Sequence, residues 1–291
     1  MSDQITTAFI QQYKAGIEVL YQQKGSRLRG AVRLEQQMGK QSFYDQINAT
    51  AVRRRTVRHG DSPYIPTPHA RRMNVLTDYD WGDFVDDMDK LRTLNDPSNE
   101  YVQAAAYALG REMDQAILDA TFATAKTGEE GGDDLTFAND GGTTVPVGGT
   151  PVGMNLDKLL QAKEALDENE AGEDRYIAMS ARQFKDLLAV EAITSADYAA
   201  IKALVHGEID TFLGFKFIRV SSALMSVDGS SYRRVPAWSK EAMLLGIGKD
   251  IEGEIERRAD KSFSWYAYAC ASFASTRMQG KGVVEILCNE A

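Results

Sequence analysis

Residues 50–80 carry too few apolar side chains to fold alone, and this segment most constrains how the chain can fold. Its first half, residues 50–58, intersperses a few β-branched residues with four arginines: Arg53, Arg54, Arg55 and Arg58. Three prolines follow between residues 63 and 68, and they exclude a helix and disfavour a central strand. We therefore predict an extended hairpin, with strands at 50–58 and 71–76. Such a hairpin is not stable by itself in water, so it must lie against another surface.

Charge is distributed unevenly along the chain, whose net charge is −9. Between residues 24 and 72 there are eleven lysines and arginines against three acidic residues, so this stretch carries +8 and the remainder −17. A basic segment on an acidic chain indicates contact with nucleic acid or with an acidic protein surface. The sign of the charge does not choose between these two partners.

The N-terminal segment predicts a helix with a narrow apolar stripe. Four apolar side chains recur at every fourth position, which is the spacing of one helix face: Ile5, Phe9, Tyr13 and Ile17. Nothing in residues 24–48 suggests a compact domain of its own. We therefore expect the stripe to contact a different subunit.

An aspartate-rich segment follows the basic hairpin. Residues 78–89 contain six aspartates, with Trp81, Phe84, Val85 and Met88 interleaved at helical spacing. Carboxylates in this segment are candidates for the acidic partner of the arginines, and we select Asp83, Asp86 and Asp87. They do not follow a calcium-loop pattern, so we expect no metal there.

A very long helix is predicted next. Asp96 and Pro97 form a good helix start, with aspartate as N-cap and proline in the first turn. Apolar residues recur from Val102 to Ala120, and the predicted helix runs to about residue 126. Thirty residues would span about 45 Å, much more than an average helix. Residues 127–153 are rich in Gly and Thr and predict a long loop or a short hairpin.

From residue 155 onward, helical and strand patterns alternate. Helices are predicted after three good N-caps, Asn155, Ser180 and Ser195, with strands at 175–179 and 214–220. Further strands are predicted at 243–247, 251–256, 263–273 and 283–287, with a turn at 228–229. The fold class is therefore α+β, with an α/β portion in the second half.

No catalytic or metal-binding signature is present, so we expect a non-enzymatic protein without a cofactor. The two cysteines, Cys270 and Cys288, are too few for a disulfide framework and are expected to pack as small apolar residues. His59 and His69 are expected at the surface and His206 at a helix end. No apolar run reaches the length of a membrane helix, and no secretory signal is visible. We expect a soluble chain from a reducing compartment.

The order of these parts resembles that of tailed-bacteriophage major capsid proteins with the Hong Kong 97-like shell fold. The resemblance covers nearly the whole chain as architecture, and it is carried by RRRTVRHGDSPYIPTPHARRMNVLTDYDW, SNEYVQAAAYALGREMDQAILDATFATA, EIDTFLGFKFIRVS and STRMQGKGVVEI. It implies five parts: an N-terminal arm (1–48), an extended hairpin loop (49–80), a peripheral domain with the spine helix (81–154), an axial domain (155–247) and closing strands of the peripheral domain (248–291).

The resemblance also implies a structural role. Many copies would form pentamers and hexamers of an icosahedral phage head, with the arm and the loop lying across the neighbouring subunit. Double-stranded DNA would be packaged inside without sequence-specific binding, and the implied partners are a portal protein and scaffolding or decoration proteins. The implied location is the virion, after assembly in the cytoplasm of the host bacterium. Relatives that cross-link covalently use a loop lysine, and residues 49–80 contain none, so non-covalent stabilisation is expected.

Two alternatives remain at this point. An encapsulin-like compartment shell would share the fold and enclose protein cargo instead of DNA. A nucleic-acid-binding protein or nuclease could use the basic segment, but a nuclease needs paired carboxylates placed for two metals, and no such set can be nominated. Packaging favours an interior to which the genome does not adhere. We therefore expect the arginines to meet carboxylates of a neighbouring subunit, in residues 78–89 or at Glu252, Glu254 and Glu256.

Overall fold

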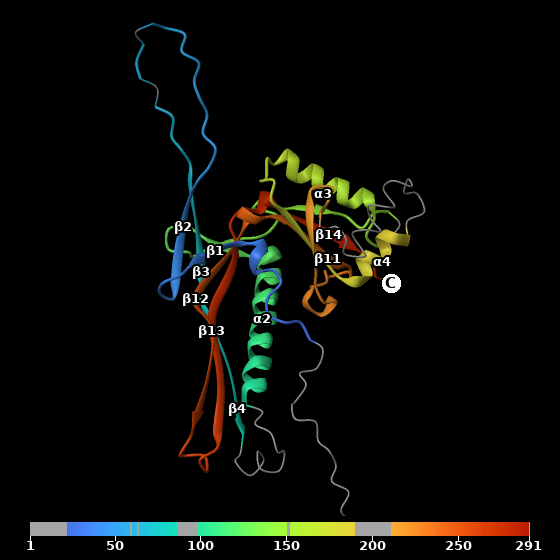
Figure 1. The fold of residues 1–291 in the computed structure, drawn as a ribbon. Coiled ribbons are helices and arrows are strands. Elements are labelled where there is room, and N and C mark those ends of the chain that lie inside the picture. The colour runs from blue at the N-terminus through green and yellow to red at the C-terminus, as the bar shows by residue number, and fades with distance from the viewer. Residues whose placement is uncertain are drawn as a thin grey trace, which may run out of the picture.

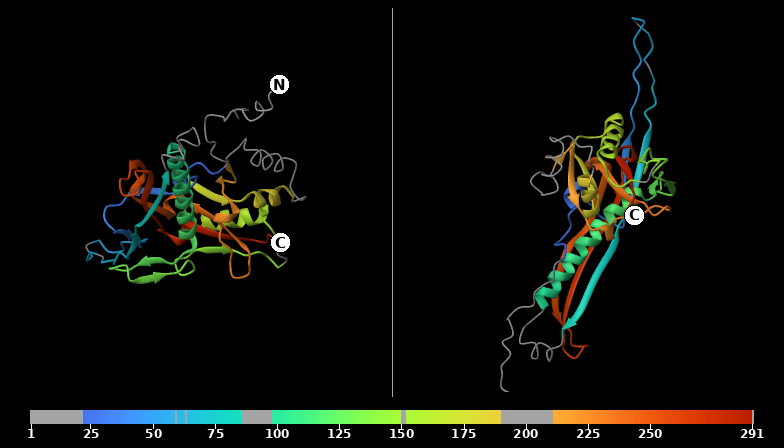
Figure 2. Two further views of the ribbon diagram at one scale, coloured as in Figure 1. Left: turned by 90° about the horizontal axis from the view of Figure 1, so that it is seen from below. Right: turned by 90° about the vertical axis from the view of Figure 1, so that its right-hand side faces the viewer.

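The computed structural model describes residues 22–58, 60–62, 64–85, 98–149, 152–189 and 211–290. The chain forms an elongated molecule with an exposed loop at one end and long strands beside a helix at the other (Figure 1). The second view in Figure 2 shows the same separation, with the loop and the strand tips at opposite ends. Three sheets organise the described residues.

The first sheet has four strands in the order β1-β12-β13-β4. They are β1 (Arg33–Gln36), β12 (Met243–Arg257), β13 (Trp265–Arg277) and β4 (Thr77–Val85). Helix α2 (Ser98–Phe122) packs along one face, chiefly against β13 and β12. Alternate residues of β13 face this helix, and Ala267, Ala269, Ala271 and Phe273 are buried there. The alternation predicted from residue 263 to 273 is confirmed from Trp265 onward, whereas Phe263 lies in the preceding turn and is exposed.

Helix α2 confirms the long helix expected from the sequence. Its buried side chains include Ala105, Leu109, Met113 and Ile117, which share one face at helical spacing. The helix ends at Phe122, four residues before the expected end at 126, because the chain enters strand β5 at Ala125. The glycine-rich stretch that follows contains a short hairpin, as expected.

The second sheet has six strands in the order β7-β14-β11-β8-β10-β9. They are β7 (Thr143–Val145), β14 (Val283–Cys288), β11 (Arg233–Ser239), β8 (Arg175–Met179), β10 (Phe215–Arg219) and β9 (Thr211–Phe212). Helix α3 (Leu156–Glu168) packs on β14 and β7, and helix α4 (Ala181–Ala189) packs on β8. Short 3-10 turns lie at Arg29–Ala31, Ser222–Leu224, Lys240–Ala242 and Gly280–Gly282.

Local signals in this part of the chain were predicted correctly. Asn155 caps α3 by accepting a hydrogen bond from the Lys158 backbone N–H at 2.9 Å, and Arg175–Met179 is a strand. Leu159 and Leu166 are buried as expected, but Leu160 is 45% exposed because it lies on the outer face of α3. The expected helix after Ser195 and His206 lie outside the described residues.

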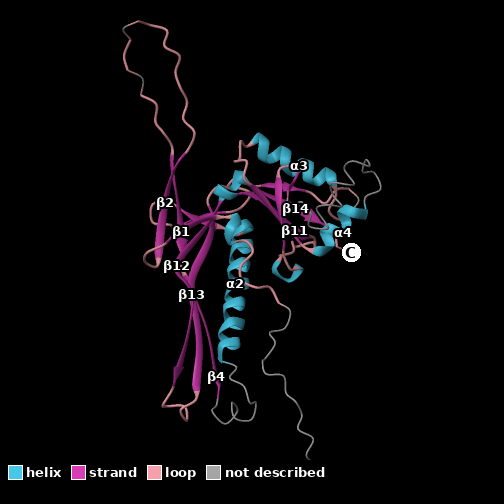
Figure 3. Cartoon of the chain, viewed as in Figure 1, coloured by secondary structure: helices cyan, strands magenta, loops and turns pink. Residues whose placement is uncertain are grey.

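The third sheet has the order β2-β3-β5-β6 and carries the exposed loop. Its strands are β2 (Gln41–Ile47), β3 (His69–Val75), β5 (Ala125–Thr127) and β6 (Asp133–Leu135). The returning strand expected at 71–76 is confirmed as β3. The expected first strand at 50–58 is wrong: the described residues of the loop are irregular (Figure 3), and pairing stops where β2 ends at Ile47.

Two further expectations need correction. Residues 77–85 form strand β4 rather than a helix, because they pair with β13 along their whole length. The last strand, β14, pairs with β11 and β7, so it belongs to the six-stranded sheet and not with the long strands of the peripheral part.

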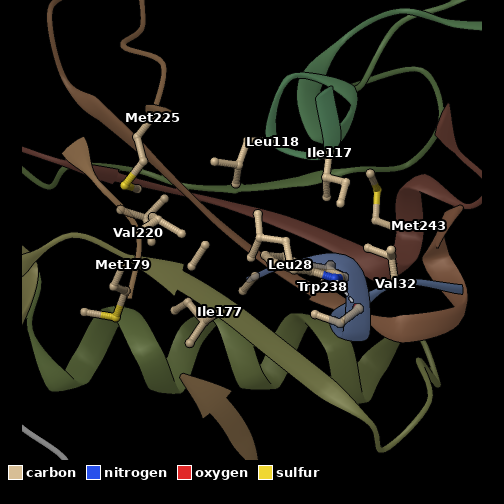
Figure 4. Packing of buried hydrophobic residues seen from close by; sticks show 14 of the residues in the cluster. Leu28, Val32, Ile117, Leu118, Ile177, Met179, Val220, Met225, Trp238 and Met243 are labelled. Carbon is tan, nitrogen blue, oxygen red and sulfur yellow. Dashed lines mark hydrogen bonds between the residues drawn. The ribbon is translucent and has the colours of Figure 1, made fainter. Parts of the chain in front are cut away.

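The main core lies where α2 meets the six-stranded sheet and the segment after residue 27. Trp238 is fully buried and donates its Nε1–H to the Ala31 carbonyl at 2.9 Å. Leu28 and Val32 lie beside it, with Ile117 and Leu118 of α2 above them (Figure 4). Residues 28–36 are therefore part of the subunit itself, which corrects the expectation of a free arm reaching residue 48.

A buried ionic cluster joins the base of the exposed loop to the rest of the molecule. The Asp140 carboxylate accepts from Arg72 Nη2 of β3 at 2.5 Å and from Arg277 Nε of β13 at 2.9 Å. Arg277 also donates to the carbonyls of Thr121 and Ala123 at the end of α2. All three charged side chains are at most 7% exposed. The cluster thus fixes β3, β13 and α2 relative to one another.

Candidate interaction surfaces

The loop between β2 and β3 is the most exposed part of the described chain. Its base is closed by a hydrogen bond from the Asn48 backbone N–H to the Pro68 carbonyl at 3.0 Å. Beyond this point apolar side chains point into solvent, with Val52 94% and Tyr64 91% exposed. Apolar side chains held so far from their own core indicate a surface that another molecule covers.

The four selected arginines all lie on this loop and are exposed. Arg53 Nη2 donates to the Asp61 carbonyl at 3.2 Å, and Arg55 Nε donates to the Val57 carbonyl at 3.1 Å. These bonds shape the loop tip, but they use backbone acceptors. Within the described residues, none of Arg53, Arg54, Arg55 and Arg58 pairs with a carboxylate. Their charge is therefore available to an acidic partner.

At the opposite end of the molecule, the sheet face turned away from α2 is acidic and aromatic. Strand pairing places three residues side by side in each row across β12, β13 and β4. The rows are Glu256–Tyr266–Phe84, Glu254–Tyr268–Gly82, Glu252–Cys270–Asp80 and Lys249–Ser272–Asp78. We call this surface the acid–tyrosine face and define it by Asp78, Asp80, Glu252, Glu254, Glu256, Tyr266 and Tyr268.

Ring contacts order the centre of the acid–tyrosine face. Tyr266 stacks on Tyr268 with ring centroids 6.0 Å apart and packs against Phe84 at 4.7 Å. Gly82 leaves room for the Tyr266 ring, because a Cβ at residue 82 would meet the Tyr266 hydroxyl in its present position. A shallow hollow of about 280 Å³ is lined by Glu254, Glu256, Arg258, Tyr266 and Tyr268.

Polar contacts order the two rows of this face that lie farthest from Tyr266, namely Glu252–Cys270–Asp80 and Lys249–Ser272–Asp78. Ser272 Oγ donates to Asp78 Oδ1 at 2.6 Å, and Lys249 Nζ lies 3.1 Å from Glu252 Oε2. The hydrogen bond to Glu252 is the main cause that raises the pKa of Lys249, so this lysine stays cationic. Two cations, Lys249 and Arg258, lie among the five carboxylates of this surface, so the face keeps a net negative charge.

The selected aspartates are not all placed on this face. Asp83 is exposed but pairs with Ala267, whose side chain points toward α2, so Asp83 lies on the opposite side of the sheet. This division follows from the strand: alternation puts Asp78 and Asp80 on one face and Asp83 on the other. Asp86 and Asp87 lie outside the described residues, and so do the stripe residues Ile5, Phe9, Tyr13 and Ile17.

The basic loop and the acid–tyrosine face cannot meet within one chain, because they project from opposite ends of the molecule (Figure 1, Figure 2). Among the described residues there is also no group of three or more His, Cys, Asp or Glu side chains that could hold a metal ion. None of the helices in the described ranges has the length and apolar character needed to cross a membrane.

Several residues with a clear structural role were not singled out from the sequence. Arg72, Asp140 and Arg277 come from three distant segments, and no local signal marks them. Asp114 is fully buried on α2, and a signal for it does exist. It directly follows Met113 on the apolar face of the helix, where a charged residue needs hydrogen-bond partners.

The fold assigns the chain to the shell-forming class with a long spine helix, an extended loop and two main sheets. Comparison with solved structures agrees. A structure from Mycobacterium phage Che8 is 17% identical, with a TM-score of 0.67, covering 96% of this chain and 97% of that one. The capsid of cyanophage P-SCSP1u is 15% identical, with a TM-score of 0.72 and coverage of 99% and 95%. The capsid of cyanophage Pam1 is 14% identical, with a TM-score of 0.71 and coverage of 98% of each chain.

The family is shown by sequence as well. The family model described as phage capsid protein matches residues 5–290, and the chain belongs to this family. No curated protein matches this chain in a sequence search. The protein is therefore a structural major capsid protein of an icosahedral shell, and its place is the virion capsid. The Hong Kong 97-like fold expected from the order of parts is confirmed.

Proposed function

We propose that pentamers and hexamers of this subunit enclose double-stranded DNA, and that the basic loop of each subunit rests on the acid–tyrosine face of its neighbour. The observation that carries the proposal is the separation of two complementary surfaces at opposite ends of one chain. Surfaces that match but cannot meet internally are suited to contacts between copies. The same arrangement supports a purely structural role without catalysis.

The chemistry of the two surfaces supports this pairing. The planar guanidinium of arginine suits bidentate contacts with carboxylates, and Arg53, Arg54 and Arg55 form a consecutive cationic run. The stacked rings of Tyr266 and Tyr268 offer area on which guanidinium groups and exposed apolar side chains such as Val52 can pack. The loop would therefore gain both charge pairing and apolar burial.

The strength of one such contact is modest. An exposed ion pair contributes about 0–1 kcal/mol, and burial of one valine-sized side chain contributes about 1.5–3 kcal/mol. A single loop contact is therefore reversible, and repetition around the shell gives stability and register. Residues 49–80 contain no lysine, which supports stabilisation without covalent cross-links.

The remaining partners follow from the capsid role. The net charge of −9 supports an interior that holds DNA without sequence-specific binding. A portal protein and scaffolding or decoration proteins complete the head, and assembly takes place in the cytoplasm of the host bacterium. Nuclease-protected DNA in purified particles would support this content, whereas a protein cargo without DNA would favour an encapsulin-like compartment.

A charge-swap experiment tests the loop contact. The triple variant Arg53→Glu, Arg54→Glu, Arg55→Glu should remain folded by circular dichroism but sediment as unassembled subunits. The matched control replaces the same three arginines by lysine, which keeps the charge and should keep assembly. Adding Glu252→Arg, Glu254→Arg and Glu256→Arg to the first variant should restore shells. Folded triple-glutamate subunits that still close into normal shells would contradict the proposed contact.

Thiol labelling gives an independent check. Cys270 is partly exposed in the centre of the acid–tyrosine face, whereas Cys288 is buried in the six-stranded sheet. A thiol reagent should label Cys270 in free subunits and should label it more slowly in shells, where the loop of a neighbour covers the face. Cys288 serves as the internal control, because it should be protected in both states.

A further inference from the structure

A buried carboxylate on α2 holds the segment that leads into the N-terminal arm. Asp114 Oδ1 accepts from Ser26 Oγ at 2.5 Å and from the Leu28 backbone N–H at 3.0 Å. The Arg27 backbone N–H donates to both oxygens of the carboxylate, at 3.1 and 3.0 Å. The side-chain amide of Gln23 donates to Oδ2 as well. One carboxylate thus binds four residues of a short consecutive segment.

This arrangement is costly for stability taken alone. Asp114 is fully buried, and every donor that the described structure gives it is neutral. Burying a carboxylate without a cation is unfavourable, and hydrogen bonds offset this cost only while all of them are made. Charge-assisted hydrogen bonds are also stronger and more directional than neutral ones. The main effect of Asp114 is therefore to hold residues 23–28 in one position on α2, and its contribution to the free energy of folding is secondary.

The helix surface is shaped for the same crossing. Gly110 lies one turn before Asp114, and a Cβ at residue 110 would come within 2.6 Å of the Gly25 carbonyl carbon. The segment therefore crosses α2 in direct backbone contact. Arg111 adds a further bond, from its Nη1 to Gln22 Oε1 at 2.7 Å. We call these contacts, made by Gly110, Arg111 and Asp114 of α2, the arm clasp.

The clasp lies directly before the point at which the chain enters the core. On its C-terminal side, Leu28, Ala31 and Val32 enter the main core. On its N-terminal side are residues 1–21, which carry the predicted apolar stripe. The clasp is thus the last described point at which the subunit holds this segment.

We infer that Asp114 is a positioning residue for assembly, which fixes the point and direction at which the N-terminal arm leaves the spine helix. This inference rests on the expectation from the sequence that the N-terminal arm contacts another copy of the chain, and it does not depend on the proposed loop contact. An arm whose exit from the subunit is fixed loses less conformational entropy when it binds its partner. Its binding then also ties the partner to α2, through the clasp.

The test uses Asp114→Asn in the full chain and in a chain lacking residues 1–21, which keeps Gln22 and every described contact of the clasp. Asparagine keeps the shape but has a single acceptor oxygen, so it cannot satisfy donors on both sides. Asp119→Asn is the matched control, because Asp119 is exposed on the same helix and its carboxylate accepts, among the described residues, from the Gln115 side chain alone. Hydrogen exchange reports on the clasp, and the critical subunit concentration for shell formation reports on assembly.

We expect amides 25–28 of the Asp114→Asn chain to exchange at least about tenfold faster, with exchange in α2 unchanged. The critical concentration should rise about tenfold in the full chain, which corresponds to about 1.4 kcal/mol, and the same substitution should have no further effect in the truncated chain. An equal effect of Asp114→Asn in both chains would assign it a merely structural role and overturn the inference. Unchanged exchange, or unchanged assembly of the full-length variant, would also overturn it.

The truncated chain separates this inference from the proposed arm contact. If removal of residues 1–21 leaves assembly normal, the arm contact itself is wrong and the inference falls with it. If truncation impairs assembly while Asp114→Asn does not, the arm contact stands and only the role of Asp114 is overturned.

Discussion

Replacing Asp140 by asparagine should destabilise the subunit strongly, whereas replacing Arg72 by methionine should leave its stability almost unchanged. The buried cluster contains two cations and one anion, since Asp140 pairs with both Arg72 and Arg277. The surplus charge is on the Arg72 side, where Arg72 Nε is buried without a hydrogen-bond partner in the described structure. Arg277 is better satisfied, because three backbone carbonyls accept from it in addition to Asp140.

The expected magnitudes follow from this asymmetry. Asp140→Asn leaves two buried guanidinium groups without a counter-ion, and losing one partner of a buried pair costs about 3–5 kcal/mol. That is a large share of a typical unfolding free energy of about 5–15 kcal/mol. Arg72→Met keeps the volume, removes the unpartnered N–H and leaves Asp140 and Arg277 as a one-to-one pair. Its effect should stay within about 1 kcal/mol, because the remaining ions are balanced in charge and a buried N–H without a partner is removed, which offsets the lost bonds to Asp140 Oδ1 and Thr127 Oγ1.

Urea unfolding of unassembled subunits measures both effects, with circular dichroism as the signal. The midpoint of Asp140→Asn should fall clearly, and that of Arg72→Met should remain near the parent midpoint. The double variant Asp140→Asn, Arg72→Met should recover part of the loss, because one uncompensated cation is then gone. If Arg72→Met is as destabilising as Asp140→Asn, the assignment of Arg72 as the surplus charge is refuted.

Two further results are expected of the unassembled subunit. Ile117→Ala should lower the unfolding free energy by about 2–5 kcal/mol, because Ile117 is fully buried, while Leu160→Ala on the outer face of α3 serves as the control and should change it by less than about 0.5 kcal/mol. Burial raises the pKa of the Cys288 thiol to about 12; the folded chain then retains a proton that the unfolded chain loses from about pH 9. Stability should therefore fall as the pH rises from about 9 to 12, and a Cys288→Ala variant, followed by urea unfolding across this range, should lose part of that slope.

Periodicity correctly predicted the elements that bury one regular face against a single neighbouring layer. The stripe from Ala105 to Ile117 packs chiefly against β13 and β12, and the alternation in β13 has α2 on a single side. The same reasoning failed for β4. Trp81, Phe84 and Val85 happen to fit helical spacing, but pairing with β13 decides the conformation, and local propensity yields to that long-range contact.

The acid–tyrosine face could be predicted only in part for the same reason. The alternation of Glu252, Glu254 and Glu256 indicates a half-exposed strand, and this is confirmed in β12. That Asp78 and Asp80 lie on the same face depends on the register of β13 with β4, which is set by pairs almost two hundred residues apart in sequence. The buried cluster of Arg72, Asp140 and Arg277 depends on contacts between residues 68 and 137 positions apart, so no local pattern could reveal it.

The distribution of apolar residues explains why assembly must use extended and charged segments. Large apolar side chains such as Trp238 and Phe273 are fully buried in the core of the subunit. What remains for neighbours is a loop with a few exposed apolar residues and a run of arginines, and a face of carboxylates around stacked tyrosines. Each such contact is weak and is screened by salt, so subunits can dissociate and rebind while a shell is still incomplete. With the proposed loop contact, a closed shell would become stable only when every subunit both gives and receives its loop, and weak contacts would in this way select one closed geometry over misassembled ones.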